Sequence, residues 1–156
     1  MAIVLRVKGL PVPQGSMTCV GGGAGRPHNV QPSNKADLQP WRLQVAAAAR
    51  RAKEQLGAVW ISHDPVRVDL TFTFARPKSV KTRDWPSVYP DIDKLARAVL
   101  DGLTMGEIWA DDGQCVILNV TKAYPDTAVH CPYPEDVLEV PGVVIRLSDA
   151  PADRLI

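Results

Sequence analysis

A proline followed by two acidic residues opens the stretch that most constrains how this 156-residue chain can fold. Pro90 cannot occupy a helix interior, so we expect a helix to begin here, with Asp91 at or near its N-cap. Over residues 91–103 the apolar side chains recur with helical spacing and form one face. Gly102 is placed to weaken or end this helix. The stretch therefore predicts one amphipathic helix that starts at an acidic pair.

A charged stripe runs beside the apolar face of the predicted helix. Asp93, Arg97 and Asp101 are spaced four residues apart, so they share one side of the helix. A second acidic pair, Asp111 and Asp112, follows after a short link, just before an apolar alternation typical of a strand. Two acidic pairs at the edges of regular elements indicate a site for a hard cation.

Each acidic pair also has a purely structural interpretation. Asp91 alone can be a helix cap, and Asp111-Asp112-Gly113 alone can be a turn before a strand. Asp93, however, has no capping role once Asp91 holds the cap. Two neighbouring carboxylates repel each other unless a cation or a proton joins them. The two pairs together therefore favour the metal-site hypothesis.

Length and composition predict one globular domain of residues 1–156 with a genuine core, since 46% of the residues are hydrophobic. No apolar run approaches the 18 residues of a membrane span. Arg6 and Lys8 interrupt what would be the apolar region of a signal peptide, which argues against secretion. The three cysteines form no CxxC pair, so we expect neither a disulfide framework nor a zinc ribbon, and a cytoplasmic location.

Charge is distributed unevenly along the chain. Residues 1–90 carry 13 Lys and Arg against 5 Asp and Glu, whereas residues 91–156 carry 5 against 12. This asymmetry suits a phosphate-binding surface that adjoins an acidic metal site, although solvated faces could also produce it. Four cations cluster in the loop that leads to the first acidic pair, at Arg76, Lys78, Lys81 and Arg83. We expect this loop to steer phosphate groups toward the acidic pair.

The remaining pattern predicts an α+β fold, a small mixed sheet with two main helices packed on it. The expected strands are residues 2–9, 66–75, 114–124 and 142–148, and the expected helices are residues 37–56 and 91–103. Strand 66–75 alternates between apolar and polar residues and is predicted to be half-buried. Strand 114–124 is apolar on both faces and is predicted to be central.

Two segments are predicted to be irregular. Residues 14–34 contain a glycine-rich tract without the spacing of a nucleotide-binding loop, and we expect a flexible surface loop. Ser33 or Asp37 could cap the helix that follows. Residues 149–156 are expected to be a frayed tail.

The segments PDIDKLARAVLDGL and IWADDGQCVILNVTKAY resemble the RusA family of Holliday junction resolvases, which are common in bacteriophages and prophages. The family pattern is a DxDN…K…DAL helix, a tryptophan and then DDxQV at the start of a strand. The resemblance is dense over residues 89–124 and extends loosely to the N-terminal strand. It rests on both acidic motifs at this spacing.

This resemblance implies a homodimeric, Mg²⁺-dependent endonuclease that cuts four-way DNA junctions, with Mn²⁺ as a possible substitute. The family's metal-binding carboxylates correspond to Asp91, Asp93 and Asp112, with Asp111 adjacent. The chain departs from the family at two positions, with Lys94 in place of an asparagine and Arg97 in place of the active-site lysine. Arginine can hold a phosphate but cannot release a proton at neutral pH.

Two hypotheses therefore follow from the sequence. The first is a metal-dependent, structure-selective endonuclease with Asp91, Asp93, Asp112 and Arg97 as catalytic residues, and with Lys94 beside the basic loop on the DNA-binding surface. The second is a junction-binding protein that has lost cutting because Arg97 replaces the lysine.

Overall fold

The computed structural model describes residues 2–22, 24–25, 29–57 and 63–151. Its strands are β1 (Ala2–Lys8), β2 (Met17–Val20), β3 (Asn29–Pro32), β4 (Val66–Thr73), β5 (Cys115–Ala123) and β6 (Gly142–Asp149). Its α-helices are α1 (Lys35–Leu56) and α2 (Ile92–Met105), and its short 3₁₀ helices are η2 (Asp112–Gln114), η3 (Pro125–His130) and η4 (Pro134–Asp136). The predicted strands and helices are thus all present, each within a few residues of its expected bounds.

Four strands form the main sheet, in the order β1-β6-β4-β5. β6 pairs antiparallel with both β1 and β4, whereas β4 and β5 are parallel. Parallel neighbours need a crossover connection, and the segment between β4 and β5 contains α2. This arrangement confirms the predicted α+β fold with a mixed sheet.

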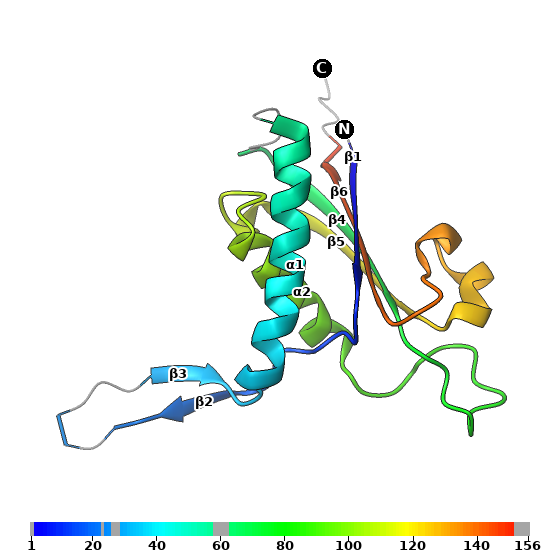
Figure 1. Ribbon diagram of the computed structural model, residues 1–156, viewed down its shortest axis with the longest axis horizontal. Coiled ribbons are helices and arrows are strands. Elements are labelled where there is room, and N and C mark those ends of the chain that lie inside the picture. The colour runs from blue at the N-terminus through cyan, green and yellow to red at the C-terminus, as the bar shows by residue number, and fades with distance from the viewer. Residues whose placement is uncertain (1, 23, 26–28, 58–62, 152–156) are drawn as a thin grey trace.

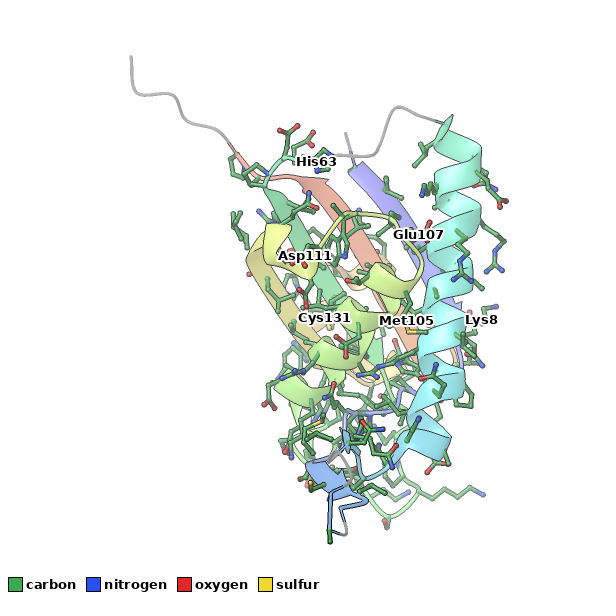
Figure 2. The ribbon with its side chains drawn as sticks, turned by 90° about the vertical axis from the view of Figure 1, so that its left-hand side faces the viewer. Lys8, His63, Met105, Glu107, Asp111 and Cys131 are labelled. Carbon is green, nitrogen blue, oxygen red and sulfur yellow. The ribbon has the colours of Figure 1, made fainter. Side chains whose placement is uncertain are left out.

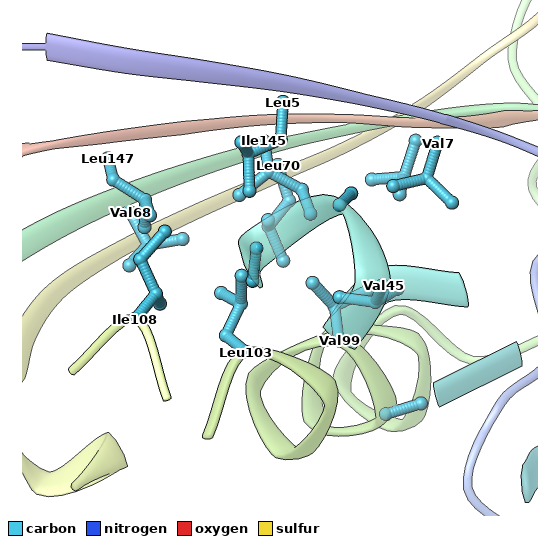
Figure 3. Close-up of a cluster of buried hydrophobic side chains, with 14 of the residues drawn as sticks. Leu5, Val7, Val45, Val68, Leu70, Val99, Leu103, Ile108, Ile145 and Leu147 are labelled. Carbon is cyan, nitrogen blue, oxygen red and sulfur yellow. The ribbon is translucent and has the colours of Figure 1, made fainter. Parts of the chain in front are cut away.

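Both helices cover one face of the sheet, and the segment with η3 and η4 lies on the other (Figure 1). The core between helices and sheet is built mainly from aliphatic side chains of α1, α2, β1, β4 and β6 (Figure 3). Leu103 and Val99 of α2 and Val45 of α1 are fully buried there, opposite Leu70 of β4 and Ile145 of β6. No helix among the described residues is long and apolar enough to cross a membrane.

Gly102 does not end α2, contrary to the prediction. The helix continues to Met105, and Gly106 occupies its C-cap position. A Cβ on Gly102 would lie 2.8 Å from the Cβ of Val45, and one on Gly106 would lie 2.5 Å from the Cβ of Ala49. The two glycines therefore allow α1 and α2 to pack closely, and this packing fixes the position of α2 on the sheet.

The predicted environments of two strands are wrong. β4 is central and buried on both faces, because the segment that contains η3 and η4 covers its polar side. Leu138 donates a backbone hydrogen bond of 2.9 Å to the hydroxyl of Thr73 on that side. β5 is instead the last strand of the sheet, and Val116 remains 58% exposed.

The prediction of an irregular loop at residues 14–34 is also wrong in part. β2 and β3 form an antiparallel hairpin that extends away from the main sheet (Figure 1). Asn34 anchors its base, since its side chain accepts a 2.7 Å hydrogen bond from the Gly15 amide and donates one of 2.8 Å to the Pro13 carbonyl. Asn34, rather than Ser33 or Asp37, occupies the N-cap position of α1. Part of the glycine-rich tract and residues 152–156 of the tail lie outside the described residues.

Candidate active site

A groove of about 620 Å³ lies between α2 and the helix-facing side of β5. Three charged residues line it, namely Asp93, Arg97 and Asp112. The i, i+4 spacing places Asp93 and Arg97 on one face of α2, and Asp112 begins the short η2 turn that leads into β5. Its other lining residues are apolar: Ile92, Ala96, Leu100, Leu118 and Val120. The fold thus brings together members of both predicted acidic pairs.

The three charged side chains of this groove are open. All three residues are exposed, and none makes a side-chain hydrogen bond or ion pair with another residue that the structure describes. An unpaired carboxylate on an otherwise apolar wall is available to a ligand. The groove therefore presents two carboxylates and one guanidinium to whatever binds there.

Asp91 occupies the N-cap position of α2, as predicted, but its side chain makes no capping hydrogen bond. Its carboxylate instead pairs with the ammonium group of Lys94 at 3.3 Å, and both side chains are about half exposed. Such an exposed ion pair is weak. Asp91 lines a second groove, which shares Ile92, Asp93 and Val120 with the first.

Asp111 has a structural role at the turn before β5 (Figure 2). Its carboxylate accepts a 2.6 Å hydrogen bond from the Gly113 amide, and the side-chain carbonyl of Gln114 accepts bonds from the Ala110 and Asp111 amides. This reciprocal arrangement is a capping box. It occupies one oxygen of Asp111 and fixes the turn from which Asp112 projects.

The open carboxylates suit a magnesium ion. Asp93 and Asp112 present carboxylate oxygens from two sides of one groove, and such hard oxygens are the ligands that Mg²⁺ prefers. No group of three or more His, Cys, Asp and Glu side chains among the described residues is gathered closely enough to hold a metal by itself. Mg²⁺ is commonly held by only one or two carboxylates, and takes its other oxygens from water and substrate phosphates. The groove therefore fits an ion that binds together with a phosphate.

Lys122 is a site residue that the sequence reasoning missed. Its ammonium group donates hydrogen bonds to the carbonyls of Val88 (2.5 Å) and Pro90 (2.7 Å), immediately before Asp91. Burial lowers the pKa of Lys122, while the nearby Asp91 acts in the opposite direction. The one sequence signal is that Lys122 breaks the apolar alternation of β5 on the side that faces α2.

The basic loop contains two kinds of cation. The Arg76 guanidinium stacks over the Tyr124 ring at 4.4 Å and bonds to the carboxylate of Asp126 at 2.8 and 3.1 Å. Arg83 donates a 2.8 Å hydrogen bond to the Tyr124 hydroxyl. These two arginines hold the loop on the protein, whereas Lys78 and Lys81 are exposed. The lysines are thus the loop cations that are free to meet a phosphate.

The sequence profile of the family described as Endodeoxyribonuclease RusA matches residues 12–131. The chain belongs to the RusA endodeoxyribonuclease family. The matched region includes α2, both acidic pairs, the basic loop and all the residues that line the first groove. A comparison with the curated proteins finds no match. Membership of the RusA family indicates a hydrolase that cuts DNA.

Proposed function

We propose that this RusA-family protein is a Mg²⁺-dependent, structure-selective endonuclease that cuts four-way DNA junctions in the cytoplasm. The observation that supports it most strongly is the groove between α2 and β5, where Asp93, Arg97 and Asp112 are open side by side. Two carboxylates and a permanent cation are the groups that metal-assisted phosphodiester hydrolysis needs.

In this proposal Asp93 and Asp112 would hold the ion, and Asp91 would join them if its weak pair with Lys94 were exchanged. The chemistry that Mg²⁺, or Mn²⁺ in its place, would supply there is Lewis acidity and activation of water near neutral pH. The held carboxylate of Asp111 keeps the η2 turn in place and so orients Asp112. Lys122 orients Asp91 by bonding to the carbonyl of the preceding residue.

Arg97 stabilises charge on the phosphate. It lies one helical turn from Asp93, so both can meet the same phosphate group. A guanidinium is a permanent cation, so this side chain would contribute a fixed positive charge and no proton. Phosphoryl-transfer transition states need such charge, and we therefore favour an active nuclease over a junction-binding protein that has lost cutting.

We further propose that the protein acts as a homodimer on a four-way junction, with one site in each subunit and Lys78 and Lys81 on the DNA-facing surface. Symmetric cutting of a four-way junction needs two active sites, and each chain offers one acidic groove between α2 and β5. The edge strand β5, with Val116 exposed on it, is a suitable contact for a second copy.

A cleavage assay tests the proposal directly. An end-labelled four-way junction and a linear duplex of the same sequence are incubated with the protein in Mg²⁺, Mn²⁺, Ca²⁺ or EDTA. We expect paired nicks in the junction with Mg²⁺ or Mn²⁺, and no cutting of the duplex. Junction binding without product in either metal would instead support the second hypothesis. Equal cutting of duplex and junction would contradict structure selectivity.

A further inference from the structure

The second groove, of about 960 Å³, continues from the acidic groove along the loop that precedes α2. Its rim carries three exposed residues, with Trp85 40%, Val88 50% and Tyr89 75% accessible. Other residues that line it include Asp91, Lys122 and His130. An apolar and aromatic surface thus adjoins the carboxylates of the proposed active site directly.

The exposed aromatic side chains sit on a loop that is fastened on both sides. Thr127 donates a 2.7 Å hydrogen bond to the carbonyl of Asp84, just before Trp85. Lys122 bonds to the carbonyls of Val88 and Pro90, on either side of Tyr89. The loop therefore holds Trp85 and Tyr89 at the surface in a fixed arrangement. Exposed aromatic side chains on a hydrogen-bonded backbone are typical of a binding site rather than of a flexible surface loop.

The residues that line this groove indicate which kind of ligand it can bind. Aromatic rings bind flat π-systems by stacking, and every nucleobase offers such a face. Lys122 lines the groove, and the exposed Lys78 and Lys81 belong to the loop that precedes Trp85 in the chain. Their positive charge complements a phosphate backbone. Because Asp93 lines both grooves, a strand whose phosphate lies at the acidic groove would place a neighbouring base at the aromatic rim.

We propose that the groove beside Trp85 and Tyr89 binds an unstacked nucleobase of the DNA strand next to the phosphate that is cut. This inference rests on the proposed nuclease function and adds a source of structure selectivity to it. Extracting a base from a continuous duplex requires unpairing and unstacking, whereas a base at a branch point leaves its stack more easily. The groove would therefore favour branched DNA without reading a sequence.

The test removes either a nucleobase from the DNA or the aromatic rings of Trp85 and Tyr89 from the protein. Four-way junctions that carry a single abasic nucleotide at successive positions around the branch point are bound to the Asp93→Asn variant, which keeps the DNA intact. The same junctions are bound to this variant with Trp85→Ala and Tyr89→Ala added. Leu10→Ala, at another exposed apolar residue, is the matched control. Thermal unfolding of each variant shows whether it is folded.

We expect one or two abasic positions to weaken binding by roughly tenfold, as expected for the loss of one stacked base. The same positions should have no further effect once Trp85 and Tyr89 are replaced, whereas Leu10→Ala should leave the abasic effect unchanged. Equal abasic effects with and without the two rings would overturn the proposal. The proposal would also be overturned if the variant with both Trp85→Ala and Tyr89→Ala became monomeric and bound every junction more weakly by the same factor. The groove would then be a contact between subunits.

The outcome is distinguishable from failure of the proposed function. If the wild-type protein cuts junctions but shows no coupling between the abasic position and the rings, only the base-binding groove is wrong. If the wild-type protein cuts no junction in any metal, the nuclease proposal is wrong, whatever the binding data show.

Discussion

The two acidic pairs are alike in the sequence, but in the folded protein the two carboxylates of each pair make different contacts. Each pair stands at the start of a regular element: Asp91 occupies the N-cap position of α2 and Asp93 lies in its first turn, whereas Asp111 and Asp112 lie in the η2 turn before β5. In each pair the first carboxylate is held by the protein, in an ion pair with Lys94 or in a capping box. The second carboxylate of each pair is open, and the open ones share a groove.

The cations show the same division. Arg42 is held, because it forms an ion pair with Asp101 and a hydrogen bond to the Gln14 side chain, whereas Arg97 on the same helix pair is open. Arg76 and Arg83 are held on Tyr124, whereas Lys78 and Lys81 in the same loop are exposed. We infer that held charges shape the site and that open charges are available to metal and DNA, with Asp91 as the exception because its ion pair with Lys94 is exposed and weak. Four experiments test this distinction, in order of decreasing expected effect.

The largest effect should come from the open carboxylates. We expect Asp93→Asn or Asp112→Asn to reduce junction cutting by more than the roughly 10²–10³-fold that removal of a single charge-stabilising donor costs, because the ion itself is lost. Junction affinity should remain, since it depends on Lys and Arg contacts to phosphates. Single-turnover cleavage and a gel-shift titration measure the two quantities.

Asp111→Asn is the matched control, because asparagine caps a helix as well as aspartate does. We expect it to cut at nearly the wild-type rate. Asp91→Asn should abolish cutting, since the pair of Asp91 with Lys94 is too exposed to keep the carboxylate from the metal. An Asp111→Asn variant as inactive as Asp93→Asn would remove the distinction between held and open carboxylates.

Arg97 should give the next largest effect. Arg97→Ala is expected to slow single-turnover cleavage by about 10²-fold, the magnitude typical for loss of one donor to a developing charge. Arg97→Lys should change the rate little, because both side chains carry a positive charge. Arg51→Ala, an exposed arginine on α1, is the control. A wild-type rate no higher than that of Arg97→Ala would favour the junction-binding hypothesis.

The loop cations should change salt dependence more than rate. Replacement of Lys78 and Lys81 with alanine should reduce the slope of log affinity against log salt by up to about 0.9 per lost phosphate contact. The melting temperature of this lysine variant should equal that of the wild type, because neither lysine is buried. Arg76→Ala with Arg83→Ala should instead lower the melting temperature, since these arginines anchor the loop. An unchanged slope for the lysine variant would place the DNA-binding surface elsewhere.

The smallest effect concerns Asp69, a held carboxylate on the far side of β4 from the helices. Burial by itself raises the pKa of Asp69, but hydrogen bonds from Arg67 and Asn119 outweigh this effect, so the pKa lies below its usual range. A carboxyl group whose pKa is lowered by folding stabilises the protein above its unfolded pKa and loses that contribution as the pH falls.

We therefore expect the free energy of unfolding to fall below about pH 4, and Asp69→Asn to flatten this dependence while lowering stability at neutral pH. Denaturant titrations at several pH values measure it, with the exposed Asp37→Asn as control. An Asp69→Asn protein with the wild-type pH dependence would show that other carboxylates dominate acid unfolding.

Much of the fold was predictable because its signals are local. The proline before Asp91 and the helical spacing after it correctly predicted where α2 begins, and alternation correctly predicted β4 and β5 as strands. The family resemblance and the two acidic motifs correctly indicated a RusA endodeoxyribonuclease. The roles of Asp91, Asp93, Asp112 and Arg97 in cutting stay predictions.

The main strands and helices, the family and the placement of carboxylates at two element starts thus followed from the amino-acid sequence alone, whereas the β2–β3 hairpin did not. The central position of β4 and the edge position of β5 emerged only on folding, because a strand's neighbours depend on which segment covers which face and not on the strand's own pattern. Folding also decided which carboxylate of each pair is open, that Gly102 lies against Val45, and that Lys122 reaches the chain before Asp91. Capping and periodicity act within a few residues, whereas these contacts join residues 32 to 57 positions apart, which only packing brings together.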